Sequence, residues 1–450
     1  MKFTTFKAAA LVAAVASAFA TQANAAGFML TEQSAGALGR AYAGVGVDGT
    51  DISGTFYNPA TMALHQGTKF QAGFVHVGLN LDYAGDDGST ENGRLKSQTI
   101  PHGYITHQIN DSTWVGLAMT VPFGMGTEFD DDWEGAGRGI SAQVLTFDFN
   151  PNVAWKMTDK FSVGAGVSIQ YASAELKMRN YIAETVHGQS LAALIAGGPA
   201  DADTVLRDSS VDSKLEVDSI AWGFNLGAMW CPAENLRFGV SYRSKINHDA
   251  DGDLTINNVR ARGSLAGQEA TLQAILRGVG NYGTMNGEAT LSTPAWVMVN
   301  AAWDVNDLLS LYATFRWTDW SSFDELKITS NGVEKSTIRN DWKDTYLGSL
   351  GADLRLTDWW TLRGGIAYES SPISDPRTRT AIIPDADRWW FAIGSSFKVT
   401  KDLQADVSFA HLHGVHERSV YASDKAGSER LGKFRKLDAY LFGVQMVYNF

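Results

Sequence analysis

The stretch that decides the fold is the end of the chain, residues 440–450, which read YLFGVQMVYNF. Every second residue from Tyr440 to Phe450 is large and apolar, whereas the positions between them include Gly443, Gln445 and Asn449. This alternation predicts a β-strand with one apolar face and one more polar face. The chain therefore ends on a strand that suits a boundary between an apolar and a polar medium.

The same period of two recurs from about residue 68 onward and predicts fourteen strands. They are expected at 68-84, 95-109, 113-122, 140-157, 160-178, 212-230, 235-247, 286-303, 308-329, 337-356, 358-370, 386-399, 402-414 and 434-450. Their connections alternate between tight turns rich in Asp or Asn and mostly long loops, including 179-211, 248-285, 371-385 and 415-433. Short turns on one side and long loops on the other are typical of an outer-membrane barrel. We predict an all-β, fourteen-stranded antiparallel transmembrane β-barrel, whose even strand number leaves no edge in lipid.

Composition narrows the class of partner. The 450-residue chain has a formal net charge of −12, which argues against nucleic-acid binding because that requires basic patches. Cys231 is the single cysteine, so no intramolecular disulfide can form. We expect no cofactor.

The first 25 residues have the features of an export signal. Lys2 and Lys7 precede a short apolar run at 8–20, and Ala23-Asn24-Ala25 fits the rule for signal-peptide cleavage. The apolar run falls short of the ~20 residues that a spanning helix needs. We therefore predict a cleaved signal peptide at 1-25 and a mature chain starting at Ala26.

Residues 26–63, AGFMLTEQSAGALGRAYAGVGVDGTDISGTFYNPATMA, lie between this signal and the first expected strand. A barrel can be built without such a segment. We therefore expect residues 26-66 to form a hatch that fills or gates the lumen of a barrel formed by residues 67-450.

Several short motifs resemble the FadL-type outer-membrane long-chain fatty acid transporter family. They are Ala26-Gly27-Phe28, Leu38 to Gly44, Asn58-Pro59-Ala60, Pro122 to Thr127 with Asp130 to Trp133, and Ser370-Ser371-Pro372 with Ile383 to Asp385 and Asp387-Arg388. The similarity extends over essentially the whole mature chain. It implies a fourteen-stranded barrel with an internal hatch in the outer membrane, and uptake of hydrophobic compounds, most notably long-chain fatty acids.

The resemblance also implies roles for residues of the hatch and of the third strand. Phe28 would either contact an acyl chain in an inner site or simply anchor the start of the chain. Asn58, Pro59 and Ala60 would fix the backbone of the hatch, because Pro restricts φ and Asn caps turns. Pro122 and Gly124 would either open the wall for lateral release or mark an ordinary strand end.

A carboxylate ligand would need a cation, which the family places on the fifth and tenth strands, with an acidic residue near the end of the eleventh. Glu369 matches the family's acidic residue in type. In an ungapped comparison the family's two basic residues correspond to Met178 and Ile338, and Arg179 and Arg339 follow one residue later. A one-residue offset reverses the face of a strand. Arg179 and Arg339 are candidates, because a bulge or a one-residue gap would restore both to the lumen. If both face lipid, an uncharged hydrocarbon is the favoured ligand.

Two long loops contain apolar patches of helical period, with Leu191 and Leu194 in one and Leu272 and Ile275 in the other. In the family such loops capture the ligand, although the same pattern would serve packing between loop helices. Lipopolysaccharide would surround this side of the barrel, and the terminal Phe450 would be read by barrel-assembly machinery.

Other functions have less support in the sequence. His411, His413 and His416 lack a fourth ligand of suitable spacing, so we expect hydration and no metal site, and Asp130 to Asp132 fit a solvated loop better than an ion site. A barrel enzyme would need a nucleophile paired with a base on one face, which is not evident. A general porin would leave the hatch and the apolar loops unexplained.

Overall fold

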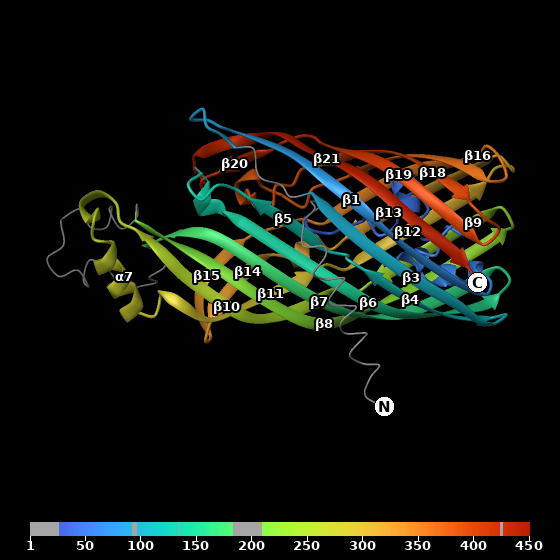
Figure 1. Cartoon of the computed structure of the whole chain (residues 1–450), viewed down its shortest axis with the longest axis horizontal. Helices are drawn as coiled ribbons and strands as arrows, with labels where there is room; N and C mark the ends of the chain where they lie inside the picture. Colours follow the sequence, from blue (N-terminus) through green and yellow to red (C-terminus); the bar gives the residue numbers. More distant parts are fainter. Residues whose placement is uncertain (1–26, 92–96, 134, 183–208, 424–425) are drawn as a thin grey trace.

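A computed structural model shows a closed β-barrel with the N-terminal segment inside it (Figure 1). The structure describes residues 27–91, 97–133, 135–182, 209–423 and 426–450. The last strand, β21 (Arg430–Asn449), pairs antiparallel with the first, β1 (Thr68–Gly85), and closes the wall. The predicted all-β, fourteen-stranded antiparallel barrel is confirmed. The predicted signal peptide, 1-25, lies outside the described residues.

The wall strands follow one another in chain order around the barrel. After β1 they are β3 (Gln98–Asn110), β4 (Thr113–Thr120) with β5 (Gly124–Glu128), β6 (Ser141–Thr158), β7 (Phe161–Tyr181), β8 (Ser210–Ala233), β9 (Leu236–Arg243) with β10 (Ile246–Arg260), β11 (Gly283–Thr293) with β12 (Trp296–Asp304), β13 (Leu309–Thr318) with β14 (Glu325–Ser330), β15 (Val333–Arg339) with β16 (Thr345–Arg355), β17 (Trp360–Glu369), β18 (Arg388–Lys398), β19 (Leu403–Gly414) and β21. Two short strands, β2 (Thr90–Glu91) and β20 (Ser419–Tyr421), belong to loops. Wherever two labels share one position in this order, the strand is interrupted.

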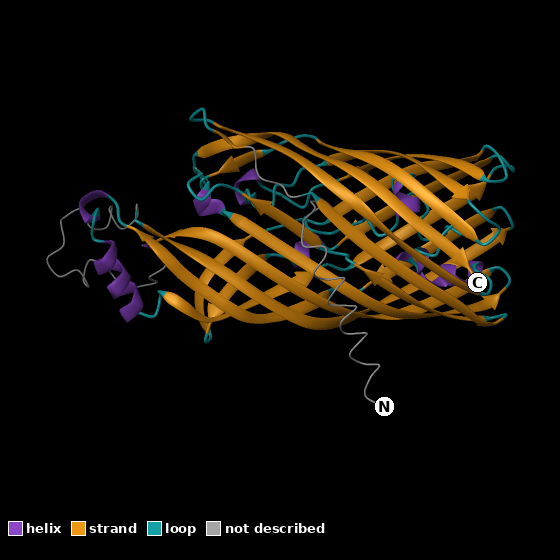
Figure 2. Cartoon of the chain, in the orientation of Figure 1, coloured by secondary structure: helices purple, strands orange, loops and turns teal. Residues whose placement is uncertain are grey.

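Helices are short and few among the described residues (Figure 2). They are α2 (Ala35–Leu38), α3 (Gly54–Tyr57), α7 (Glu269–Gly278) and the 3-10 segments η1 (Pro59–Leu64), η2 (Ala136–Arg138), η3 (Gly263–Leu265), η4 (Trp320–Ser322) and η5 (Pro376–Thr378). None of the helices in the described parts of the chain is both long and apolar enough to cross a membrane.

The strand boundaries predicted from alternation are wrong at several places. The expected strand 308-329 breaks at η4, because β13 pairs with β16 whereas β14 pairs with β15 and β11. The expected strand 113-122 ends at Thr120 and resumes as β5, which the sequence placed in a loop. The expected loop 248-285 begins with thirteen residues that belong to strand β10, which ends at Arg260. Alternation continues through such breaks, so it does not reveal them.

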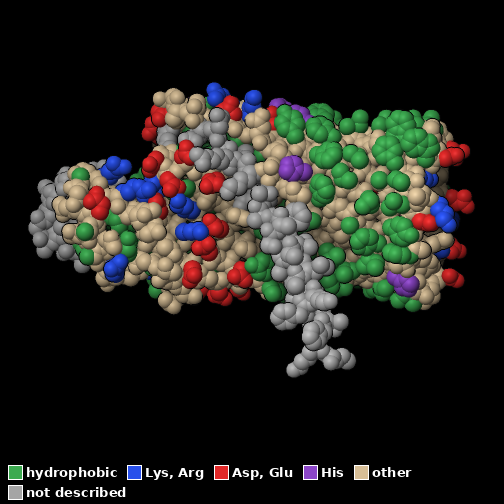
Figure 3. All heavy atoms as spheres, viewed as in Figure 1, with side chains coloured by type: hydrophobic (Ala, Val, Ile, Leu, Met, Phe, Trp, Pro, Cys, Tyr) green, Lys and Arg blue, Asp and Glu red, His purple; other side chains and the backbone are tan. Residues whose placement is uncertain are grey.

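The outer surface is divided into an apolar and a charged zone. Large exposed apolar side chains, among them Trp222, Leu350 and Ile393, are numerous on the outer surface. Apolar side chains gather on the half of the barrel that carries the short turns, and charged side chains are scattered over the other half and at the short-turn end (Figure 3). An apolar outward band of this kind is the surface that a membrane barrel presents to lipid. The long strands therefore extend beyond the lipid on the loop side.

The segment from Gly27 to residue 66 fills the lumen on the short-turn side. Residues 27–48 and 51–62 are all buried. Gly365 of β17 and Gly351 of β16 lie against the backbone and Cβ of Arg40, where any larger side chain would clash. The wall is thus shaped to accept this segment, which we call the hatch.

Candidate functional site

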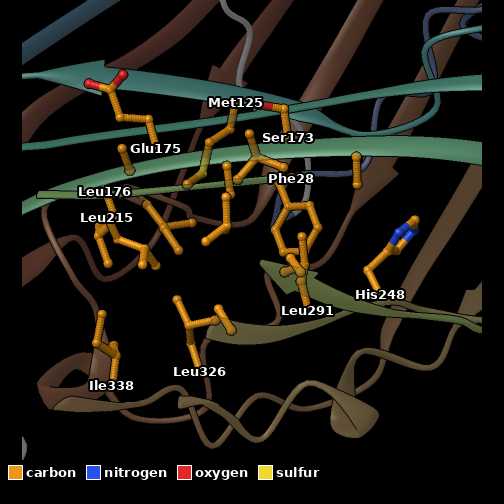
Figure 4. A pocket seen from close by; sticks show the side chains of 18 of the residues that line it. Phe28, Met125, Ser173, Glu175, Leu176, Leu215, His248, Leu291, Leu326 and Ile338 are labelled. Atoms are coloured by element: carbon orange, nitrogen blue, oxygen red, sulfur yellow. The ribbon is translucent and has the colours of Figure 1, made fainter. Parts of the chain in front are cut away.

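An apolar chamber lies in the lumen above the hatch, and its lining side chains come from eight strands, from the hatch and from loops. Figure 4 shows these side chains pointing into the chamber. The empty space among its lining side chains, including the part open to solvent, is about 760 Å³. Its wall includes Met125, Ala172, Leu176, Leu215, Val217, Ala250, Leu291, Leu326, Ile338 and Ile382. An apolar lining of this kind is typical of sites that bind small hydrophobic ligands.

Phe28 forms part of the floor of this chamber and belongs to an aromatic cluster. Its ring centroid lies 4.8 Å from that of Trp320, 5.3 Å from Phe323 and 5.9 Å from Phe123, all in edge-to-face geometry. Trp342 completes the cluster at 6.1 Å. The sequence pointed to Phe28 but missed its partners, which lie far along the chain in loops between strands.

Gly27 holds the end of the hatch in place beside Phe28. It adopts φ 63°, and an added Cβ would lie 2.8 Å from the rings of Trp320 and Trp342, so only glycine fits. Its N–H donates to Oδ2 of Asp385 at 2.6 Å, and Arg388 donates to the other oxygen at 2.8 Å. The loop before β18 therefore holds the start of the hatch through the hydrogen bond from Gly27 to Asp385.

The chamber has little polar character. Among its described lining residues there is no Lys or Arg. His248 is satisfied within the wall, since Gln170 lies 3.0 Å from its Nε2 and Ser219 lies 2.9 Å from its Nδ1. A carboxylate deep in this chamber would find no cation to pair with.

A second cavity, of about 1160 Å³, lies at the loop-side mouth and is lined by Arg138, Arg179 and Arg339. It shares Ile338 and Thr380 with the chamber, so the two spaces adjoin. The apolar chamber suits the hydrocarbon tail of an anionic amphiphile, and the arginine-lined cavity beside it suits the charged head group.

Arg179 and Arg339 reach this mouth without facing the chamber. The pairing of β7 with β8 runs to Tyr181 without a register shift, so Met178 takes the inward face and Arg179 the opposite one. The side chain of Arg179 is already engaged, with Asp212 and Asp132 each at 3.4 Å. Among the described residues, Arg339 is exposed and has no ion-pair partner. The bulge that would have turned Arg179 inward is absent from this pairing.

Glu369 lines neither cavity. Its carboxylate accepts from Arg316 at 2.6 Å and lies 3.5 Å from Nε of Arg388, and Arg316 also donates to the hydroxyl of Thr31 at 2.9 Å. Glu32 of the hatch is buried nearby, and burial raises the pKa of its carboxyl to about 7. Glu369 therefore belongs to the polar contacts that hold the hatch against the wall.

The third strand is interrupted next to the chamber. β4 ends at Thr120 and β5 begins at Gly124. Pairing of β3 with β4 stops at Gly103 and Met119, so β3 residues 98–102 pair with β1 and not with β5. The wall has a gap in its ladder on this side.

The hatch occupies that gap. Leu30 donates its N–H to the carbonyl of Pro122 at 2.8 Å, and Gly124 donates to the carbonyl of Phe28, also at 2.8 Å. Met29 and Phe123 form an isolated antiparallel bridge between these two bonds. Moving this end of the hatch would therefore expose unpaired backbone groups at the interruption.

Asn58, Pro59 and Ala60 lie in the hatch, far from both cavities. The side-chain amide of Asn58 donates to Gly46 at 2.9 Å and to Ala228 of the wall at 3.1 Å, and its Oδ1 accepts from Ala60. Asn58 thus caps η1, and Pro59 takes the first position of that turn.

The apolar loop patches are only partly described. Leu272 of α7 is buried and Ile275 half-buried, and α7 projects at the loop end of the barrel (Figure 1). Leu191 and Leu194 lie outside the described residues.

Fold, lipid-facing band, hatch and apolar chamber define an outer-membrane channel for hydrophobic compounds. Residues 16–450 match the model of the family described as outer membrane protein transport protein (OMPP1/FadL/TodX), and the chain belongs to that family. The long-chain fatty acid transport protein of Escherichia coli K12 is 29% identical over 478 residues, with 99% of each chain covered. Outer membrane protein P1 of Haemophilus influenzae is 28% identical, covering 95% of this chain and 96% of that protein.

Solved structures agree with the fold. A FadL homologue of Pseudomonas aeruginosa superposes with a TM-score of 0.82 at 26% identity, covering 94% of this chain and all of the other. The toluene transporter TodX of Pseudomonas putida has the same fold, with a TM-score of 0.67 at 18% identity, covering 89% of this chain and 94% of that one.

Proposed function

We propose that this protein takes up long-chain fatty acids or similar anionic amphiphiles across the outer membrane. The carrying observation is the adjacency of the two cavities, which share Ile338 and Thr380. The head group would rest among Arg138, Arg179 and Arg339 while the tail enters the apolar chamber. The names of the curated relatives support the same substrate class.

Transfer from the chamber to the bilayer would follow the interruption of the third strand. A tail in the chamber contacts Phe28, whose neighbours Met29 and Leu30 pair with residues 122–124. Displacing Phe28 would loosen this pairing and open the wall beside β3. Pro122 and Gly124 then act in gating because they bound the interruption, and no covalent chemistry is required.

Uncharged hydrocarbons are the second candidate. The absence of Lys and Arg among the described residues of the chamber favours them, because a neutral ligand needs no counter-charge. TodX, the solved relative with the same fold, is named as a toluene transporter.

Binding measurements on the purified protein separate the two. We expect oleate to bind more tightly than oleyl alcohol, and Arg179→Gln with Arg339→Gln to weaken oleate by roughly ten- to a hundredfold, which is the worth of a charge-assisted hydrogen bond. Asp212 keeps Arg260 at 2.7 Å in that variant, so no buried carboxylate is left alone. Arg435→Gln, an exposed arginine on the outer surface, is the matched control.

The outcomes distinguish the proposals. Equal affinity for oleate and its alcohol, unchanged in the double variant, would reject recognition of the carboxylate and leave the hydrocarbon hypothesis. No binding of either compound would reject the chamber as a ligand site.

We also infer that Phe450 serves barrel assembly and that lipopolysaccharide borders the loop side. Phe450 is 77% exposed at the end of β21, and its N–H donates to Thr68 at 3.0 Å. Deleting Phe450 should lower the amount of folded protein in the outer membrane without changing ligand affinity in what does assemble.

A further inference from the structure

A group of three potential metal ligands lies on the outer surface, away from the lumen. His411 and His413 occupy alternate positions of β19 and therefore share one face, and Asp438 of β21 is the direct cross-strand partner of His413. Each offers one ligand atom, and these atoms lie within 4.8 Å of one another. The sequence provided the two histidines, but only the register of β19 and β21 adds the carboxylate.

The side chains are already partly organised. Nδ1 of His413 lies 2.8 Å from Oδ1 of Asp438. The ring of His411 stacks on Tyr440, with centroids 4.8 Å apart and an interplanar angle of 8°. Among the described residues, Nε2 of His411 is buried and has no hydrogen-bond partner. A buried polar atom without a partner is costly, so this imidazole has a nitrogen available to a ligand.

We propose that His411, His413 and Asp438 form a binding site for a divalent transition-metal ion of the zinc type. Two imidazoles and a carboxylate suit zinc, whose donors at 2.0–2.2 Å stand roughly 3.4 Å apart in a tetrahedron. His413 is 50% exposed, so its side chain has room to rotate and bring the ligand atoms from within 4.8 Å of one another to this spacing. The remaining position would stay open to water or to an oxygen donor outside the protein.

The location gives the site a structural consequence. β19 and β21 carry exposed aromatic side chains here, including Phe409 and Tyr440, of the kind that form an aromatic belt in membrane barrels. Such belts sit at the level of lipid head groups. A bound ion would join the two strands and add positive charge at this level on the loop side.

Zinc binding to the purified, detergent-solubilised protein tests the proposal, with a tag that contains no histidine. After removal of metals with a chelator and incubation with zinc, the metal retained through desalting is measured by mass spectrometry. We expect one zinc ion per chain for the wild type and none for His411→Phe or Asp438→Asn. Phenylalanine preserves the stack on Tyr440, and the heat-dependent gel mobility of a folded barrel verifies that each variant is intact.

His416→Gln is the matched control, because His416 is an exposed histidine of the same region that bonds to Asp387 at 2.8 Å. It should retain zinc. The proposal is overturned if the wild type retains no zinc, if either His411→Phe or Asp438→Asn retains as much as the wild type, or if His416→Gln loses it. Cobalt gives an independent readout, since its visible absorption bands should appear with the wild type and vanish with His411→Phe.

Discussion

Replacing Arg40 with Met should release the hatch from the wall while leaving the barrel closed. The guanidinium is fully buried, pairs with Asp48 of the hatch, and donates to Asp353 of β16 at 2.7 Å. It also lies 4.1 Å from the ring centroid of Tyr312. Met retains the apolar stem and removes the charge, so two buried carboxylates lose their main partner.

Breaking one side of a buried ion pair costs about 3–5 kcal/mol. Arg363 lies 3.8 Å from Asp353 and offsets part of this loss, so we take the lower end, about 3 kcal/mol. That corresponds to roughly a hundredfold rise in the population of the undocked hatch. Hydrogen exchange measured by mass spectrometry should show residues 34–48 exchanging faster by that factor, with β16 unchanged.

A compensating variant makes this test specific. Adding Asp48→Asn and Asp353→Asn to Arg40→Met removes the stranded charges and should restore a large part of the protection. If Arg40→Met leaves the exchange of residues 34–48 at the wild-type rate, then this ion cluster does not hold the hatch, and the reasoning is refuted.

Three further changes probe the end of the hatch. Phe28→Ala removes a buried ring and should weaken docking of residues 27–33 by about 3–5 kcal/mol, seen as faster hydrogen exchange; unchanged exchange would contradict the role of the aromatic cluster. Burial raises the pKa of Glu32 to about 7, so folding favours its protonated form. The contribution of Glu32 to stability is then largest below about pH 4.3, the usual pKa of an unfolded glutamate, and is lost as the pH rises toward 7. Thermal unfolding between pH 5 and 8 should show this decline, and Glu32→Gln should make it smaller; an equal decline in the variant would assign it to another group. Met29 and Phe123 form a non-hydrogen-bonded antiparallel pair, and the Cα atoms of such a pair are close enough for a disulfide. The double variant Met29→Cys with Phe123→Cys should therefore link the hatch to the wall when oxidised. Oxidation should block uptake and reduction restore it, whereas uptake in the oxidised form would show that this end of the hatch need not move.

The barrel could be predicted from sequence because its signal is local. Alternation in residues such as 440–450 marks the strands, and turn residues mark the short connections. The interruptions at η4 and at residues 121–123 depend on which strand pairs with which, and alternation carries no such information. The loop predicted at 248-285 begins too early along the chain, because strand β10 extends to Arg260.

The candidate site shows the same limit. Phe28 could be singled out through the resemblance, but Trp320 and Trp342 join it only through the closed topology. Arg179 could be named as a cation one residue out of register, but its place at the mouth follows from where β7 leaves the lipid. Nothing in the sequence indicated that Asp438 could share a metal site with the histidines, because only strand pairing brings it opposite His413.

The central claim, that a hydrophobic ligand passes through the apolar chamber, is tested most directly by uptake. Radiolabelled oleate would be supplied to a strain lacking its own transporter and carrying this gene. Ala250→Phe places a ring in the chamber, whereas Ala313→Phe places the same ring on the lipid-facing surface of β13. With equal amounts in the membrane, the wild type and Ala313→Phe should restore uptake and Ala250→Phe should not. Wild-type uptake no higher than that of an empty vector, or full uptake by Ala250→Phe, would contradict the account.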